Sequence, residues 1–100
     1  MKVRWTEPAV GQLHHIFTYI AADNASAAYR TVRKIREAIL RIARMLYSGR
    51  AGRIADTREI TVPGTSYLVA YKIVENALHV LAISTGHSNG LKLSSSIETA

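Results

Sequence analysis

Arginine dominates the chemistry that this sequence could perform. Thirteen lysines and arginines against seven acids give a net charge of +6, and nine of those cations fall between residues 30 and 58. They are Arg30, Arg33, Lys34, Arg36, Arg41, Arg44, Arg50, Arg53 and Arg58. A guanidinium binds a carboxylate or a phosphate through two parallel hydrogen bonds. The charge therefore predicts an acidic partner, either nucleic acid or an acidic protein segment, with a merely solvated helix face as the alternative.

The acidic side chains and the histidines lack the spacing of a catalytic or metal site. The acids are scattered over helix ends, turns and one strand, so no pair suggests acid–base catalysis, and Glu59 is expected to be a surface charge on its strand. His14 and His15 are neighbours, which on a helix point about 100° apart and cannot easily share a metal. Gly49 and Gly52 are not followed by the Lys-Ser/Thr pair of a phosphate-binding loop. We therefore expect no metal and no cofactor.

The tyrosines are expected to serve packing. Tyr67 and Tyr71 fall on one face of a predicted strand, where aromatic side chains pack well against their neighbours. Tyr19 and Tyr29 flank the break between two predicted helices and are expected to brace them. Aromatic residues are not interleaved with the arginines along the sequence, so a stacking platform for single-stranded nucleic acid is not indicated.

Length and composition indicate one domain with an ordinary core. The chain has 100 residues, of which 48% are hydrophobic, and it contains no cysteine, which excludes disulfides and fits a reducing cytoplasm. No apolar run approaches the ~20 residues of a membrane span, and the first residues become charged too early for a signal peptide. We expect a cytoplasmic domain over residues 1–86, followed by a polar tail over residues 87–100.

Two helices are predicted in the first half of the chain. Thr6 is a good N-cap, and apolar residues then recur at three- and four-residue steps to about Ala22. After Asn24, a second cap, the apolar spacing is four, three, four, three, four at Ala28, Val32, Ile35, Ile39, Ile42 and Leu46. So short a break predicts an antiparallel helical hairpin. A coiled-coil dimer is the competing interpretation of the second helix, although three heptads are few.

Strands flank and follow this hairpin. Residues 3–5 alternate as a short strand, residues 47–57 are predicted to be a loop, and strands are predicted at 58–62, 67–74 and 77–84, the last two forming a hairpin. The order is strand, helix, helix, strand, strand, strand. It predicts an α+β fold in which the helical hairpin packs on one face of a mostly antiparallel four-stranded sheet.

These residues together resemble the ParE-like toxins of type II toxin–antitoxin modules, within the wider RelE/ParE toxin superfamily. The resemblance spans about residues 2–87 and depends on the order of several short motifs. The motifs lie at residues 3–6, 16–21, 23–24, 49–53, 57–59, 62–65, 67–71 and 80–83. The family implies the small α+β toxin fold and a co-encoded antitoxin, whose flexible C-terminal segment wraps the toxin. Its ParE branch poisons DNA gyrase, and its RelE branch cleaves mRNA on the ribosome.

The resemblance separates the two branches by individual residues. RelE-like nucleases place basic residues on the hairpin strand and after the last strand, and a proton-transfer group in the tail. The matching positions here are Leu68, Ser88 and Ser94, none of which supplies a cation or a proton-transfer ring. The resemblance therefore implies a protein that is not an enzyme. The ParE branch usually ends its last strand in His-Gly, then a basic residue and an aromatic residue or proline, but this chain keeps only the glycine, Gly86.

The leading hypothesis is a toxin that binds a protein target, with DNA gyrase as the candidate, and that a ParD-like antitoxin neutralises. The expected target-binding residues are Arg50, Arg53, Arg58, His87 and Lys92, the histidine being placed just where the last strand ends. The expected antitoxin-binding residues are Arg30, Lys34, Arg41 and Arg44, which would meet an acidic or amphipathic segment. Neither a membrane nor direct nucleic-acid binding is expected.

Two alternatives make different predictions. A ribosome-dependent RNase would cleave mRNA on expression and would lose its toxicity on His87→Ala. A degraded, non-toxic member that only binds an antitoxin or nucleic acid would permit normal growth when expressed alone.

Overall fold

The computed structural model describes residues 2–45, 49–52 and 54–85. Along the chain the elements are β1 (Lys2–Trp5), α1 (Glu7–Ala21), α2 (Ala25–Arg44), β2 (Arg50–Ala51), β3 (Arg58–Thr61), β4 (Tyr67–Val74) and β5 (Ala77–Thr85). The predicted tail, residues 87–100, lies outside the described residues, so the division at residue 86 stays a prediction.

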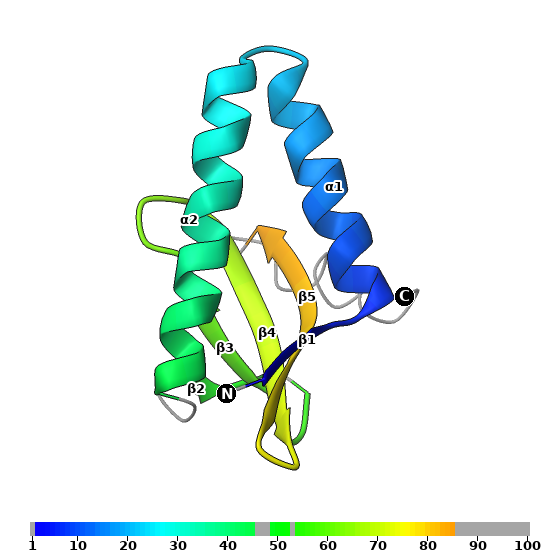
Figure 1. Ribbon diagram of the computed structural model, residues 1–100, viewed down its shortest axis with the longest axis vertical. Coiled ribbons are helices and arrows are strands. Elements are labelled where there is room, and N and C mark those ends of the chain that lie inside the picture. Colours follow the sequence, from blue (N-terminus) through cyan, green and yellow to red (C-terminus); the bar gives the residue numbers. More distant parts are fainter. Residues whose placement is uncertain (1, 46–48, 53, 86–100) are drawn as a thin grey trace.

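Both helices begin at the predicted caps. The side-chain hydroxyl of Thr6 accepts a hydrogen bond from the Ala9 amide at 3.4 Å, and the Asn24 side chain accepts one from the Ala27 amide at 3.0 Å. Each bond satisfies a first-turn amide that has no partner within its helix. The short connection between the helices folds α2 back beside α1, and the two helices cover one face of the sheet (Figure 1).

The sheet has five strands in the order β1-β5-β4-β3-β2, and every neighbouring pair is antiparallel except the parallel pair β1–β5. This confirms the predicted α+β class with its mostly antiparallel sheet. The prediction of four strands missed β2, which lies in the segment predicted to be a loop. A strand of two residues is too short to show any periodicity in the sequence.

The core lies between the helices and the inner face of β4 and β5. Val69 is opposite Ile83 and Tyr71 is opposite Val80, although the spacing from Val80 to Ile83 is three residues instead of two. The extra residue is Leu81, a β-bulge without a partner on β4. Side chains alternate between the two faces of a strand, so residues three positions apart would normally face opposite sides. The bulge shifts the alternation by one residue, and Val80 and Ile83 therefore both face the helices, where both are buried.

Glu59 does not lie on the surface, which corrects the expectation of a surface charge. Its exposed fraction is 5%. The strand β2 places Arg50 directly opposite Glu59, which makes β3 an interior strand of the sheet. An Arg50 Nη2 atom lies 3.9 Å from Glu59 Oε1. Burial of this carboxylate is thus tolerated because a guanidinium lies beside it.

Two adjacent residues of α2 test how much the inner face of the helix contributes. Ile39 is 2% exposed and Leu40 is 58% exposed. We expect Ile39→Ala to lower the free energy of unfolding by about 2–5 kcal/mol, because it removes buried methyl groups and leaves a cavity. Leu40→Ala, the matched control, should change it by less than about 0.5 kcal/mol. Urea unfolding of the full chain measures both, and equal losses would contradict this placement of the core.

Candidate partner-binding site

The outer surface of α2 carries a continuous group of cations, here called the α2 cationic face. All of its members are exposed, and they are Arg30, Arg33, Lys34, Arg36, Arg41 and Arg44. The opposite side of the helix holds the buried Ala28, Ile35, Ala38, Ile39 and Ile42. Within the described part of the chain, none of the six cations forms an ion pair. The four predicted antitoxin-binding residues therefore share one free surface with Arg33 and Arg36, which the sequence-based selection left out.

Two exposed apolar residues interrupt this cationic face. Tyr29 is 64% exposed and Leu40 is 58% exposed. With Arg33 and Arg36 they occupy positions 29, 33, 36 and 40, a spacing that aligns side chains along one side of a helix. Tyr29 directly precedes Arg30 in the sequence, but its place beside Arg33 and Arg36 depends on the helix, which brings positions four and seven apart to one side. The α2 cationic face is thus amphipathic.

Tyr29 also braces the helical hairpin, as predicted. Its ring meets the ring of Phe17 on α1 edge to face, with the centroids 5.0 Å apart and the planes at 74°. This geometry is favourable for two aromatic rings. The same contact holds the exposed edge of Tyr29 in a fixed position at the junction of α1 and α2.

The structure describes two of the five predicted target-binding residues. Arg50 and Arg58 lie on the neighbouring strands β2 and β3, whereas Arg53, His87 and Lys92 lie outside the described residues. The Arg50 side chain is 65% exposed. Arg58 is half-buried, and its Nη1 donates to the Gly49 carbonyl at 2.8 Å. Arg50 is thus available to a partner, and Arg58 has at least one structural contact.

Both backbone groups of Gly49 form hydrogen bonds with side chains of the sheet. Its amide donates to the hydroxyl of Tyr71 at 2.9 Å, and its carbonyl accepts the bond from Arg58. A Cβ atom at this position would lie 2.5 Å from the Tyr71 hydroxyl oxygen, which is too close for any side chain. The two residues of the Gly49-Arg50 motif therefore have different functions. The glycine allows the backbone to pack against Tyr71, and the arginine side chain beside it is exposed at the surface.

A second surface feature is a groove of about 580 Å³ at the end of the sheet, where Arg58 and Lys72 lie with Asp56. The carboxylate of Asp56 offsets part of the positive charge of the two cations. Among the described residues, no group of three potential ligands could hold a metal ion. Likewise, no helix within the described ranges is long and apolar enough to cross a membrane.

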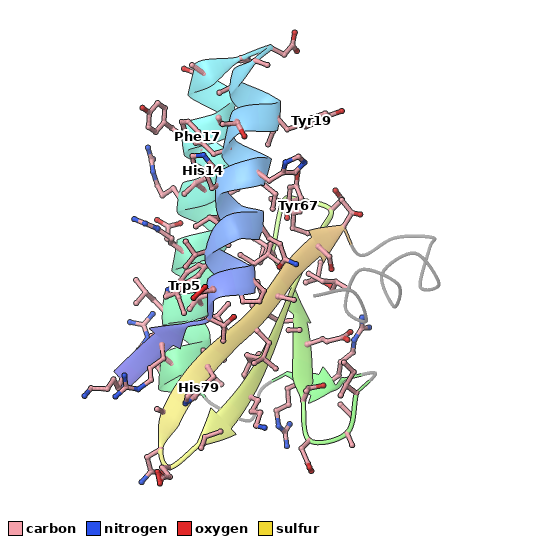
Figure 2. The ribbon with its side chains drawn as sticks, turned by 90° about the vertical axis from the view of Figure 1, so that its right-hand side faces the viewer. Trp5, His14, Phe17, Tyr19, Tyr67 and His79 are labelled. Atoms are coloured by element: carbon pink, nitrogen blue, oxygen red, sulfur yellow. The ribbon has the colours of Figure 1, made fainter. Side chains whose placement is uncertain are left out.

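A larger groove of about 810 Å³ separates α1 from the ends of β4 and β5. Tyr19 and Tyr67 both line it, and both lie on the same side of α1 in Figure 2. Tyr19 is 75% exposed and faces this groove instead of α2, whereas Tyr29 makes the ring contact between the helices, so of the two tyrosines predicted to brace the hairpin the structure supports Tyr29. Burial, with a smaller contribution from the neighbouring Tyr19, raises the pKa of Tyr67. The raised pKa keeps the Tyr67 hydroxyl in its neutral, hydrogen-bond-donating form to a higher pH than in a free tyrosine.

The opposite face of the sheet has a smaller hollow of about 290 Å³. Ala70 and Ala82, which are opposite each other on β4 and β5, line it and leave space that larger side chains would fill. Lys72 and the start of α1, at Pro8 and Gln12, also line it. The larger groove shares Pro8 and Gln12, so the two meet at the side of β5.

Comparison with known sequences identifies a family. A sequence model described as "ParE toxin of type II toxin-antitoxin system, parDE" matches residues 3–90. A curated relative from Sinorhizobium fredii (strain NBRC 101917 / NGR234), named "Putative toxin Y4kP", is 35% identical over 86 residues, which cover 86% of this chain and 88% of the relative.

Comparison with solved structures agrees at the level of the fold. The structure titled "Chromosomal ParDE TA system from P. aeruginosa" has a TM-score of 0.75 at 19% identity, covering 85% of this chain and 95% of that one. The isolated E. coli RelE toxin has a TM-score of 0.61 at 8% identity, covering 99% of this chain and 98% of that one. At these identities the likeness concerns the fold alone.

The close packing of Gly49 against Tyr71 can be tested with two glycine-to-alanine substitutions. Gly49→Ala should lower the free energy of unfolding by about 1–3 kcal/mol, because its Cβ overlaps the buried Tyr71 hydroxyl. Gly11→Ala is the control, since a Cβ there meets nothing within 4 Å, and within α1 it should stabilise by up to about 1 kcal/mol. Thermal and urea unfolding measure both. A neutral Gly49→Ala would contradict the close approach to Tyr71.

Proposed function

This chain belongs to the ParE toxin family of type II toxin–antitoxin systems, and we propose that it inhibits growth by binding DNA gyrase and is neutralised when its antitoxin docks on the α2 cationic face. Both contacts are protein–protein contacts, and neither requires a metal or a cofactor. The toxin is accordingly proposed to be a binding protein and not an enzyme.

The observation that carries the antitoxin contact is the unpaired charge on α2. Six exposed cations and one exposed acid, Glu37, share this helix face, so it keeps an excess of positive charge that an acidic segment lying across it would offset. Tyr29 and Leu40 add one exposed apolar side chain at each end of the Arg33–Arg36 pair. An amphipathic helix with acidic residues complements such a surface, because its apolar residues meet Tyr29 and Leu40 and its carboxylates meet the guanidinium groups.

The absence of a nuclease centre is supported by the position of Leu68. The family resemblance aligns this residue with a basic residue of the RNA-cleaving branch. Here it is an uncharged side chain that is 4% exposed within β4. An aliphatic side chain with so little exposure cannot neutralise the charge that develops on a phosphate during cleavage.

The target proposal predicts inhibition of gyrase by the purified full-length protein. We expect it to block supercoiling of relaxed plasmid while leaving transcripts intact on translating ribosomes. Arg50→Ala should weaken the inhibition about fivefold, or ~1 kcal/mol, because arginine is enriched among the interface residues whose truncation costs that much or more. Lys2→Ala, at the other edge of the sheet, is the control and should leave the inhibition unchanged. Transcript cleavage without gyrase inhibition would refute the proposal and favour the RNase alternative.

The antitoxin proposal predicts a salt-dependent loss of affinity on charge reversal. Arg30→Glu combined with Arg41→Glu should weaken binding of the co-encoded antitoxin about tenfold at low salt, since each reversal replaces an attraction by a repulsion. The loss should shrink as added salt screens the charges. Lys2→Glu is an exposed single-charge control. If the double variant binds the antitoxin as tightly as the unmodified chain at low salt, the antitoxin docks elsewhere.

A further inference from the structure

The strand β5 has an open edge over its second half. Its neighbour β1 pairs with residues 77–80 only, and the chain then turns away into α1 (Figure 1). β5 continues to Thr85, paired with β4 on one side. In the described structure no strand lies beside residues 81–85 on the other side.

Hydrogen bonds show which backbone groups point to this open edge. The Ile83 amide donates to Oε1 of Gln12 at 2.7 Å, so it points away from β4. In an antiparallel ladder every second residue points the same way, so the backbone groups of Thr85 also face the open edge. The partner of Thr85 on β4 is Tyr67, whose carbonyl accepts from Val62 and thus faces away from β5, as this alternation requires.

The Gln12 side chain acts as a substitute for a missing strand. Its carbonyl oxygen occupies the position in which the backbone carbonyl of a sixth strand would accept from Ile83. In the described structure, no backbone amide donates to the Ile83 carbonyl, and no acceptor pairs with the Thr85 amide. Unpaired groups of this kind form a template for the backbone of an added extended segment.

Hollows on both faces of the sheet adjoin this open edge. The groove of about 810 Å³ lies on the helix side, and the hollow of about 290 Å³ lies on the other side; Pro8 and Gln12 line both. Successive side chains of an extended segment point to opposite faces. A strand added to β5 would therefore place alternate side chains in the groove and in the hollow.

The two hollows differ in chemistry. Ile16, Ile83, Tyr19 and Tyr67 line the groove, which suits aliphatic or aromatic side chains. The hollow on the other face is also lined mainly by apolar side chains, among them Ala70, Ala82 and Leu81, but it differs from the groove in having a cation, Lys72, in its lining. Glu59 also lines it, but its carboxylate is buried beside Arg50.

A second cation lies on the same face of the sheet as Lys72. Lys72 is opposite His79 on β5, and His79 is opposite Arg4 on β1, so Arg4 and Lys72 both lie on the face away from the helices. Neither cation forms an ion pair among the described residues. Side chains that point to this face from an added strand are therefore best matched if they are acidic.

The geometry points to strand addition: the open edge of β5 binds an extended segment of the antitoxin in which acidic residues alternate with aliphatic or aromatic ones. The identity of the partner rests on the proposed function. The backbone of the segment replaces Gln12 at the Ile83 amide and pairs with Thr85. Its apolar side chains enter the groove beside Tyr19 and Tyr67, and its carboxylates lie toward Lys72.

A synthetic peptide of eight residues that alternates glutamate with isoleucine or phenylalanine tests this edge on the full-length protein. We expect fluorescence anisotropy to show binding, and hydrogen exchange of the Thr85 amide to slow on binding. The same peptide N-methylated at the amides that face β5 should bind at least about tenfold more weakly, because it loses the backbone hydrogen bonds. Equal binding by both peptides would overturn strand addition.

A charge exchange tests the acidic face of the segment. Lys72→Glu should weaken the glutamate peptide about tenfold and favour a peptide with lysine in place of glutamate. Lys2→Glu makes the same change in charge on β1, away from residues 81–85 of β5, and should leave peptide binding unchanged. If Lys72→Glu has no more effect than Lys2→Glu, the acidic register is wrong.

Competition separates this inference from the proposed function. The antitoxin should displace the peptide, and lack of competition would overturn the assignment of the edge to the antitoxin even where gyrase inhibition and neutralisation are observed. A Thr85 amide already protected in the free monomer would assign the edge to this chain's own residues. Self-association that the peptide reverses would assign it to a second copy, and either result would overturn the inference.

Discussion

The backbone amide and the hydroxyl of Thr6 both donate to the carbonyl of Val80, at 3.2 and 2.7 Å, and the same hydroxyl accepts from the amide of Ala9. One residue thus ends the parallel pairing of β1 with β5 and begins α1. Because the chain leaves the sheet at this point, α1 crosses the side of β5 instead of continuing along it. The positions of the groove, the hollow and the open edge all follow from this junction.

Packing in the core depends on the same pairing register of β5 as the hydrogen bonds of Thr6. Val80 is fully buried, and the adjacent bulge at Leu81 resets the alternation so that Ile83 is buried as well. A shift of one residue in the pairing of β5 would turn this apolar set to the other face of the sheet. The hydrogen bonds of Thr6 and the burial of Val80 and Ile83 therefore require the same register, and each supports the other.

Local features of the sequence predicted the regular elements well. Thr6 and Asn24 cap the helices where their side-chain chemistry indicates, and the apolar spacing of α2 identifies its buried side. The errors concern contacts between one element and another. Glu59 alternates like a surface charge, yet it is buried because β2 pairs with its strand, and Tyr19 faces a groove that only the folded sheet creates. Leu40 was not singled out because the buried set on α2 is complete without it.

The pairing of β1 with β5 also has a consequence for the order of synthesis. The residues of this junction, Thr6 and Val80, are 74 positions apart. At about 5–20 residues per second, a ribosome takes roughly 2–8 s to add the residues from Arg44 to Thr85. During this interval the apolar side of α2 has no complete sheet to cover it. Strand β1 pairs only after β5 has been made, so the groove, the hollow and the open edge of β5 form only after both helices have been synthesised.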